Sequence, residues 1–248
     1  MPTKRKRVVT GIPGLDPMLN GGLLPGRNIL VSGPAGSGKS TFAMHFLQKG
    51  VEEKEPSLYV TLEESREKLY ADMAEFGIDL KKMEKTKKFF FLGGPIAELH
   101  NYMKKVDATS VHLVEEIQEV IKENKIKRIV IDSLNHLTML SPCEKERRES
   151  LAALCNALSG LGVTSLLLSE IHEGEFRLSQ HGIEEFVVDG VIVLYHFKQG
   201  SKFVPGLSIR KMRGSKHEMD VKPYAITDDG FRVYPNETLF AEGIDMFN

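Results

Sequence analysis

Residues 33–40 constrain the fold of this chain more than any other feature of its sequence. The segment reads Gly-Pro-Ala-Gly-Ser-Gly-Lys-Ser and matches the phosphate-loop pattern G-x-x-x-x-G-K-S/T at every fixed position. A short apolar run at 28–32 precedes it and predicts a buried strand. The segment 39–48 that follows has apolar residues at helical spacing, and Gly50 is expected to cap this helix. The sequence therefore predicts a strand, a glycine loop and a helix, in the order that the motif requires.

A loop of this kind predicts polyphosphate binding. Its glycines let successive backbone N–H groups point inward, and the following helix adds the positive end of its dipole. Lys39 is expected to contact the β and γ phosphates, and the Ser40 hydroxyl is expected to bind Mg²⁺. The alternative is a glycine-rich turn without a ligand, which the complete match and its flanks disfavour. We therefore expect a nucleoside triphosphate to bind at Gly33, Pro34, Ala35, Gly36, Ser37, Gly38, Lys39, Ser40 and Thr41.

The composition is ordinary for a globular protein and favours no polyanionic partner. A chain of 248 residues can form one large α/β domain or two small ones. The net charge of −1 creates no global field that favours nucleic acid or membranes. No apolar run reaches about 18 residues and no signal peptide opens the chain, which predicts a cytoplasmic protein. The basic run 4–7 is expected to be a solvated tail.

Strands and helices alternate over the first two thirds of the chain, which predicts a mostly parallel sheet flanked by helices. After the phosphate loop, strands are expected at 58–62, 89–92, 127–132 and 163–169, with intervening helices that end at Gly77, cover 111–123 and begin at Pro142. Further strands joined by short turns are expected at 186–195, 207–212, 223–226 and 231–234, with a hairpin signal at 229–230. We therefore predict an α/β fold with a C-terminal antiparallel β extension. One domain is expected at 10–235, between a basic tail at 1–9 and a C-terminal tail at 236–248.

The cysteines and histidines indicate neither a disulfide framework nor a zinc site. Cys155 lies on an apolar helical stripe, which predicts a core position. The segment 141–144 looks like a capping box, which places Cys143 in the first turn of a helix. His172 and His181 flank acids in a loop, and no His or Cys spacing in the sequence is typical of zinc ligands.

Carboxylates directly follow several predicted strands. Asp132 ends its strand, where phosphate-loop enzymes bind Mg²⁺ directly or through water, and we favour this role over capping of a turn. Glu63 and Glu64 follow the second strand, at the edge where ligands bind in parallel sheets. One of them could activate a water for attack on the γ-phosphate, or both could supply charge at a helix N-terminus. The residues alone leave these two interpretations equal, and Glu170 is a weaker candidate of the same kind.

An ordered set of segments supports a family resemblance. The set contains the phosphate loop and residues 10–16, 20–22, 59–64, 166–170, 211–217 and 226–228. Together these segments resemble KaiC-like ATPases of the RecA superfamily, over residues 10 to about 235. The resemblance implies a RecA-like P-loop NTPase fold with ATP and Mg²⁺ as ligands. It also implies that Glu63 and Glu64 are the catalytic acidic pair, with Glu63 polarising the water.

The same resemblance implies a shared site. Lys211 and Arg213 look like finger residues that reach into the nucleotide site of a neighbouring subunit, and His217 and Asp228 fall where the family contacts the nucleotide across that interface. The implied partner is a second copy of the chain in a homohexameric ring. A finger of this kind contributes roughly 10³ to 10⁵ in rate, or about 4 to 7 kcal/mol, so an isolated subunit is expected to be nearly inert.

The chain also departs from the circadian clock members of that family. Those members carry two such domains in tandem, and this chain has one. Their phosphorylated Ser-Thr pair has no counterpart here, because the matching segment at 183–186 reads Ile-Glu-Glu-Phe. Autokinase activity is therefore not expected, whereas ATP hydrolysis is.

Three other functions have distinct requirements. A RecA- or RadA-like DNA-binding ATPase needs basic loops, but the loop at 170–177 holds three acids and one arginine, so nucleic acid is not an expected partner. An ATP-gated assembly scaffold with negligible turnover is compatible with every feature above and stays open. A small-molecule kinase needs an acceptor pocket and a lid, which the sequence does not indicate. We expect a regulatory or signalling ATPase whose protein partner the sequence does not identify.

Overall fold

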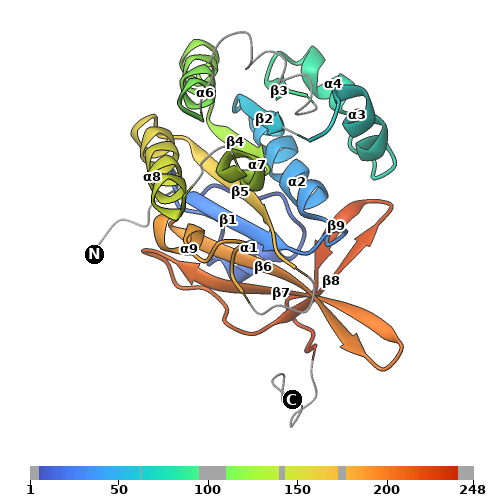
Figure 1. The fold of residues 1–248 in the computed structure, drawn as a ribbon. Coiled ribbons are helices and arrows are strands. Elements are labelled where there is room, and N and C mark those ends of the chain that lie inside the picture. The colour runs from blue at the N-terminus through green and yellow to red at the C-terminus, as the bar shows by residue number, and fades with distance from the viewer. Residues whose placement is uncertain (1–5, 62, 95–109, 140–142, 173–176, 240–248) are drawn as a thin grey trace, which may run out of the picture.

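A sheet of nine strands carries helices on both of its faces (Figure 1). The computed structural model describes residues 6–61, 63–94, 110–139, 143–172 and 177–239. The strands are β1 (Asn28–Gly33), β2 (Ser57–Thr61), β3 (Phe89–Gly93), β4 (Arg128–Asp132), β5 (Thr164–Glu170), β6 (Gly190–Gln199), β7 (Lys202–Met212), β8 (Lys222–Thr227) and β9 (Gly230–Val233). The helices within these ranges are α1 (Leu15–Met18), α2 (Lys39–Glu52), α3 (Arg66–Ala74), α4 (Leu80–Lys85), α6 (Ser110–Asn124), α7 (Leu134–Met139), α8 (Glu144–Gly160) and α9 (Glu184–Val187). The strand order is β3-β2-β4-β5-β1-β6-β7-β8-β9.

The strands from β3 to β6 in this order all run parallel. Every residue of β1, β2 and β4 is buried, which explains why their sequences are almost continuously apolar. The remaining pairs, β6 with β7, β7 with β8 and β8 with β9, are antiparallel. The predicted mixed sheet, mostly parallel with an antiparallel C-terminal extension, is confirmed.

Two apolar clusters cover the two faces of the sheet. One cluster includes Phe42 and Phe46 of α2, together with side chains of α3, α4, β8 and β9. The other includes Ile117 of α6, Leu158 of α8 and the predicted core residue Cys155. The first cluster matters for function because α2 and α3, which it anchors, both begin at the edge of the sheet where the phosphate loop lies.

The predicted role of Gly50 as a helix cap is wrong. The helix α2 continues to Glu52, and Gly50 lies inside it. A Cβ atom on Gly50 would lie 2.4 Å from the Ser57 Oγ and 2.6 Å from the Arg128 Cδ. The glycine therefore serves close packing of α2 against β2 and β4, which the local sequence does not reveal.

The predicted strand at 186–195 begins too early. Phe186 lies in the short helix α9 and has 64% of its surface exposed, and β6 starts only at Gly190. The Glu184 carboxylate accepts a hydrogen bond from the Ile183 backbone N–H at 3.1 Å, which helps to turn the chain before the strand. The next strand, β7, begins earlier than predicted because its pairing with β6 extends to Lys202.

The predicted position of Cys143 is also wrong. Cys143 is the exposed N-cap residue before α8, with φ −129°, and does not lie in the first turn. Residues 141 and 142, which completed the predicted capping box, lie outside the described residues. The short helices α1, α4 and α7 were not predicted, because runs of four to six residues carry too little periodicity to be recognised.

The N-terminal basic run is partly attached to the domain. The Arg7 guanidinium donates to the Gly22 carbonyl oxygen at 3.0 Å and to the Ser215 hydroxyl at 2.7 Å. Arg7 is therefore not part of a solvated tail, and residues 1–5 of the predicted tail lie outside the described ranges. Among the helices of the described ranges, none combines the length and the apolar character needed to cross a membrane.

Candidate functional site

The phosphate loop connects the carboxyl end of β1 to the first turn of α2. Gly36 and Gly38 have φ values of +76° and +84°, a backbone region that favours glycine. A Cβ on Gly38 would also lie 2.5 Å from the Ile226 Cδ1 of β8. The Tyr224 hydroxyl donates to the Ser37 carbonyl oxygen at 3.0 Å, so the antiparallel extension braces the loop. The backbone N–H groups at the start of α2 are thereby held as a ready anion site.

The Lys39 ammonium group lies inside this loop. Its Nζ donates to the carbonyl oxygens of Gly33 and Pro34 at 3.0 and 2.9 Å, and lies 3.8 Å from the Glu170 Oε1. Only 8% of Lys39 is exposed, and burial lowers its pKa, whereas the carboxylates of Glu170, Asp132 and Glu63 act to raise it. A cation in such a setting is poised for a ligand that brings several negative charges.

Asp132 and Ser40 lie side by side, as the magnesium prediction requires. The Ser40 hydroxyl donates to the Asp132 Oδ2 at 2.7 Å, and the Tyr59 hydroxyl donates to the same oxygen at 2.5 Å. Burial raises the pKa of Asp132, while the two hydrogen bonds and the nearby Lys39 act to lower it. The peptide bond that follows Asp132 is cis.

These two oxygen donors fit a magnesium ion. Mg²⁺ prefers oxygen ligands and commonly takes one or two from the protein and the rest from phosphates and water. No group of three or more His, Cys, Asp or Glu side chains in the described ranges is arranged to hold a metal on its own. The donor set of Ser40 and Asp132 therefore suits an ion that arrives with a phosphate ligand.

The two adjacent glutamates have different partners. The Glu63 Oε1 accepts a hydrogen bond from the Ser133 hydroxyl at 2.6 Å and lies 2.9 Å from the His136 Nδ1. The Glu64 Oε1 pairs instead with the exposed Lys68 Nζ at 3.0 Å. Both glutamates line the cavity, but only Glu63 is held from the strand β4 side, where Asp132 lies. This difference favours Glu63 over Glu64 for work on a reacting group.

A cavity of ≈ 490 Å³ joins these groups. One wall is the phosphate loop with the start of α2, including Thr41, and the other is α3 with Asp72 and Met73, together with Phe76 just after that helix. Glu170 lies at the end of β5 and Ile226 comes from β8. The cavity therefore opens at the carboxyl ends of parallel strands, where ligands bind in folds of this class.

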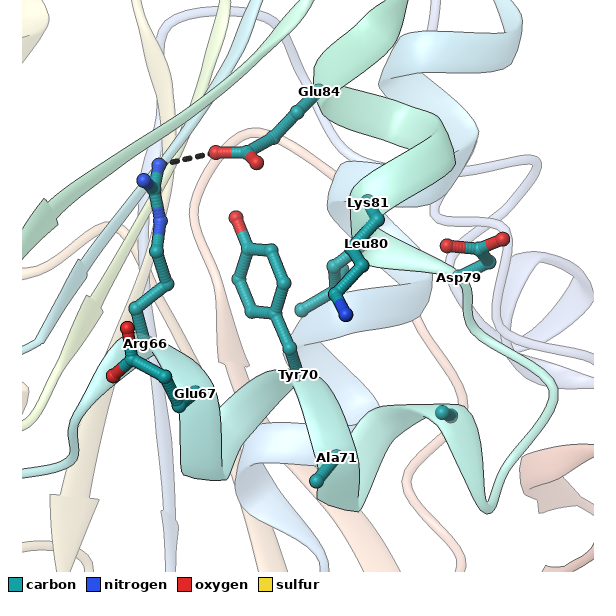
Figure 2. Close-up of a pocket in the computed structure, with 9 residues that line it drawn as sticks. Arg66, Glu67, Tyr70, Ala71, Asp79, Leu80, Lys81 and Glu84 are labelled. Carbon is teal, nitrogen blue, oxygen red and sulfur yellow. Dashed lines mark hydrogen bonds and ion pairs between the residues drawn. The ribbon is translucent and has the colours of Figure 1, made fainter.

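A second cavity, of ≈ 520 Å³, lies between α3 and α4 (Figure 2). Figure 2 shows the Tyr70 ring pointing into it between the Arg66 guanidinium and α4. Arg66 forms an ion pair with Glu84 and lies 5.3 Å from the Phe91 ring centroid. Its guanidinium already has a carboxylate and an aromatic partner, so this cavity offers less to a triphosphate than the cavity at the phosphate loop.

The predicted finger residues lie away from this chain's own phosphate loop. The Lys211 Nζ donates to the carbonyl oxygens of Glu185 and Val188 at 2.6 and 2.7 Å, and the Arg213 guanidinium donates to the Phe186 carbonyl at 3.2 Å. These carbonyls precede β6, which runs parallel to β1, so they lie toward the edge opposite the phosphate loop. Burial lowers the pKa of Lys211, and the neighbouring Arg213 lowers it further.

The other two residues implied at the interface lie in different places. Both ring nitrogens of His217 are buried and have no hydrogen-bond partner within the described ranges. Asp228 lies in the exposed turn between β8 and β9, next to Ile226 of this chain's own cavity. The backbone oxygen of Asp228 is also 3.8 Å from a Cβ built on Gly77. The roles of His217 and Asp228 stay predictions.

Three residues of the site were not predicted from the sequence. Tyr59 lies in the apolar run of β2, and its contact with Asp132 depends on β2 and β4 being neighbours. Ser133 and His136 follow Asp132 at the start of α7, a helix too short to recognise from periodicity. The available signal for Ser133 and His136 was Asp132 at the end of β4, since residues that directly follow such an acid lie at the same edge of the sheet.

Comparisons with known proteins point to one family of sequences and structures. The sequence model of a family described as the KaiC ATPase matches residues 8–238. A UPF0273 protein of Thermotoga maritima is 38% identical over 94% of this chain and 97% of its own length. The circadian clock oscillator protein KaiC of Parathermosynechococcus lividus is 35% identical, and the match covers 91% of this chain and 42% of that protein. The crystal structure of a KaiC-like protein from Pyrococcus horikoshii has a TM-score of 0.81 and 37% identity, covering 93% of this chain and 100% of the other.

Proposed function

The chain belongs to the KaiC family of ATPases, and we propose that it binds and hydrolyses ATP with Mg²⁺ as a homohexameric ring whose nucleotide sites are shared between subunits. The observation that carries the proposal is the convergence of a cation, a hydroxyl and two carboxylates on one cavity. These groups are Lys39, Ser40, Asp132 and Glu63. They correspond to the parts that transfer of a phosphoryl group to water requires.

Phosphate binding depends on the loop and on Lys39. The backbone N–H groups from Gly36 into the first turn of α2 would donate to the phosphate oxygens. The Lys39 ammonium would exchange its carbonyl partners for phosphate oxygens, which are stronger acceptors because they carry charge. Binding in this way also removes the cost of a buried cation with few charged partners.

Hydrolysis depends on the metal ligands and on Glu63. Ser40 and Asp132 would hold Mg²⁺, which neutralises charge on the β and γ phosphates when it is bound. The Glu63 carboxylate would orient a water and accept its proton while the water oxygen attacks the γ-phosphorus. The bond from that phosphorus to the bridging oxygen breaks, and ADP and phosphate leave.

Assembly depends on the opposite edge of the sheet. Lys211 and Arg213 are turned toward α9 and away from this chain's own loop, so each would serve a nucleotide on another copy. Phe186 lies on the same helix and is 64% exposed, which suits a surface that a second copy covers. The buried ring nitrogens of His217 have no hydrogen-bond partner among the described residues, which is also compatible with partners from a second copy.

An ATP-gated scaffold with negligible turnover is the second candidate. It is favoured by the backbone carbonyls that hold Lys211 and Arg213, because these cations would have to leave their present partners to reach a nucleotide. Either function would be regulatory or signalling. A DNA-binding role is not proposed, because the loop at 170–177 is acidic in sequence. Residues 173–176 of that loop lie outside the described ranges.

Light scattering after size exclusion, combined with phosphate release, tests the proposal. We expect a hexamer with ATP and Mg²⁺, and a specific activity that rises steeply with protein concentration. Lys39→Ala should lower the affinity for the nucleotide about 10-fold or more, since hydrogen bonds to charged groups contribute roughly 1.5–3 kcal/mol. A hexamer without turnover would favour the scaffold. Full activity in a monomer would contradict the shared site.

A further inference from the structure

We propose that His136 is a positioning residue for hydrolysis, which fixes the Glu63 carboxylate for work on the attacking water. This inference rests on the proposed ATPase activity and adds a residue and a role to it. It starts from one contact, because the His136 Nδ1 lies 2.9 Å from the Glu63 Oε1.

The contact leaves one carboxylate oxygen of Glu63 free for a ligand. The Oε1 accepts from the Ser133 hydroxyl at 2.6 Å as well as facing His136, and the two donors lie 3.4 Å from each other. Within the described ranges the Oε2 makes no hydrogen bond to the protein. The side chain of Glu63 is 33% exposed and lines the cavity that holds Lys39. One oxygen is therefore held while the other is available to a water.

The Glu63 side chain needs hydrogen-bond partners from another segment, because its own position in the chain does little to restrict its conformation. It lies just after β2, is exposed as a residue, and has a long side chain with several rotatable bonds. A catalytic carboxylate must be held close to its productive geometry, and small displacements are costly in rate. Two donors on one oxygen restrict the carboxylate far more than one does.

The helix that carries His136 is well anchored. Leu134 at its start is fully buried in the core beneath β4. The Asn135 Oδ1 accepts hydrogen bonds from the Glu170 backbone N–H at 3.1 Å and the Ser169 hydroxyl at 3.2 Å. The buried Leu134 side chain and the hydrogen bonds to the end of β5 thus hold the start of α7, which presents His136 to Glu63 from a fixed place.

The proposal concerns a hydrogen bond rather than a charge. The Nδ1 must carry a hydrogen to donate to the carboxylate, and both the neutral tautomer with that hydrogen and the imidazolium satisfy this condition. An amide N–H in the same place should therefore replace it. Asparagine offers such a group, because its Nδ2 sits at the same number of bonds from Cα as the Nδ1 of histidine.

The test compares His136→Ala with His136→Asn in the full-length protein. His196→Ala serves as the matched control, since His196 lies on β6 and its ring faces Phe203. Steady-state hydrolysis gives kcat and KM for ATP, calorimetry gives the affinity for ADP, and light scattering gives the assembly. We expect His136→Ala to lower kcat by about 10-fold with an unchanged KM and ADP affinity. His136→Asn should recover most of this loss, and His196→Ala should show none.

A double-mutant cycle with Glu63→Gln distinguishes positioning from a general structural effect. If His136 acts through the Glu63 carboxylate, removing it from Glu63→Gln should change the remaining rate by less than about 2-fold. An equal loss in both backgrounds, or no recovery by His136→Asn, overturns the inference. A wild-type protein without ATPase activity overturns the proposed function and this inference together, whereas a fully active His136→Ala overturns the inference alone.

Discussion

The Tyr59 hydroxyl donates a 2.5 Å hydrogen bond to the Oδ2 of Asp132, the oxygen that also accepts from Ser40. Tyr59 is buried in β2, and its hydroxyl reaches Asp132 on the neighbouring strand β4. A metal-binding carboxylate whose orientation is fixed by such a partner typically loses about 10- to 100-fold in metal affinity when the partner is removed. The hydroxyl of Tyr59 is therefore expected to tune the metal site without being a ligand.

We predict that Tyr59→Phe binds the divalent metal about 10-fold more weakly than the wild type. The measurement is a titration of the ADP-bound protein with Mn²⁺, followed by electron paramagnetic resonance, which does not require hydrolysis. Tyr234→Phe is the matched control, because Tyr234 lies beyond β9 and outside the cavity lining. Equal Mn²⁺ affinity in Tyr59→Phe and the wild type would contradict the prediction.

Replacing Gly50 by alanine should change the free energy of unfolding in the direction opposite to the usual effect of this substitution in a helix. Replacing a glycine in a helix interior by alanine normally stabilises by about 1 kcal/mol. A Cβ on Gly50 would instead lie 2.4 Å from the Ser57 Oγ and 2.6 Å from the Arg128 Cδ. We expect Gly50→Ala to lower the free energy of unfolding by about 1–3 kcal/mol through overpacking.

Chemical denaturation measures this effect, and Gly160→Ala is its control. Gly160 ends α8, and a Cβ placed on it would meet no described atom within 4 Å apart from its chain neighbours and the backbone of its own helix, so alanine there should be neutral or slightly stabilising. If Gly50→Ala proved as stable as Gly160→Ala, the packing between α2, β2 and β4 would be looser than the distances indicate.

The same glycine shows where sequence reasoning succeeded and where it failed. The phosphate loop was predictable because its glycines, Lys39 and Ser40 act within one short segment between a strand and a helix. Gly50 was misread because the need for a glycine there comes from close packing against Arg128, which is far away in the sequence. Phe186 was misread for a related cause: apolar character suggested a strand, but the residue lies exposed on α9.

The functional site divides in the same way. The positions of Asp132 and Glu63 in one cavity could be predicted, because Asp132 ends β4, Glu63 lies just after β2, and parallel strands end at one edge of the sheet. Tyr59 and His136 could not, because their contacts require the order of β2 and β4 and the fold of the six-residue helix α7. The direction in which Lys211 points likewise depends on carbonyls of α9 and of the residue after it, which no local pattern announces.

The two cysteines should differ sharply in reactivity. Burial raises the pKa of the Cys155 thiol to about 12, and nearby Asp189 adds to the shift, whereas Cys143 is exposed. At pH 8 the native Cys155 carries almost no thiolate, the form that reacts. We expect a disulfide-exchange reagent to label one thiol of the native protein and two after denaturation. In Cys143→Ser, labelling of the native protein should disappear.

The same shift has a consequence for stability at high pH. The folded protein holds the Cys155 proton more tightly than the unfolded chain, so the native state binds more protons between the usual thiol pKa of about 8.5 and about 12. The free energy of unfolding should therefore fall as the pH rises through this window. Cys155→Ala should lack that part of the pH dependence, and denaturation at pH 8 and pH 11 measures the difference. An identical pH dependence in Cys155→Ala and the wild type would contradict the assignment.

The position of Arg213 makes the shared site testable by mixing two inactive variants. Arg213 is bound to the carbonyl of Phe186, toward the sheet edge opposite the phosphate loop, so the proposed site joins Glu63 of one subunit to Arg213 of the next. Glu63→Gln and Arg213→Ala should each be nearly inactive alone.

In a 1:1 mixed ring, half of the subunits keep Glu63 and half of their neighbours keep Arg213, so about one quarter of the sites should be intact. We expect phosphate release near a quarter of the wild-type rate after the subunits are mixed and reassembled. If both groups served the same subunit's nucleotide, no mixture would contain an intact site, and the rate would stay at the level of the separate variants.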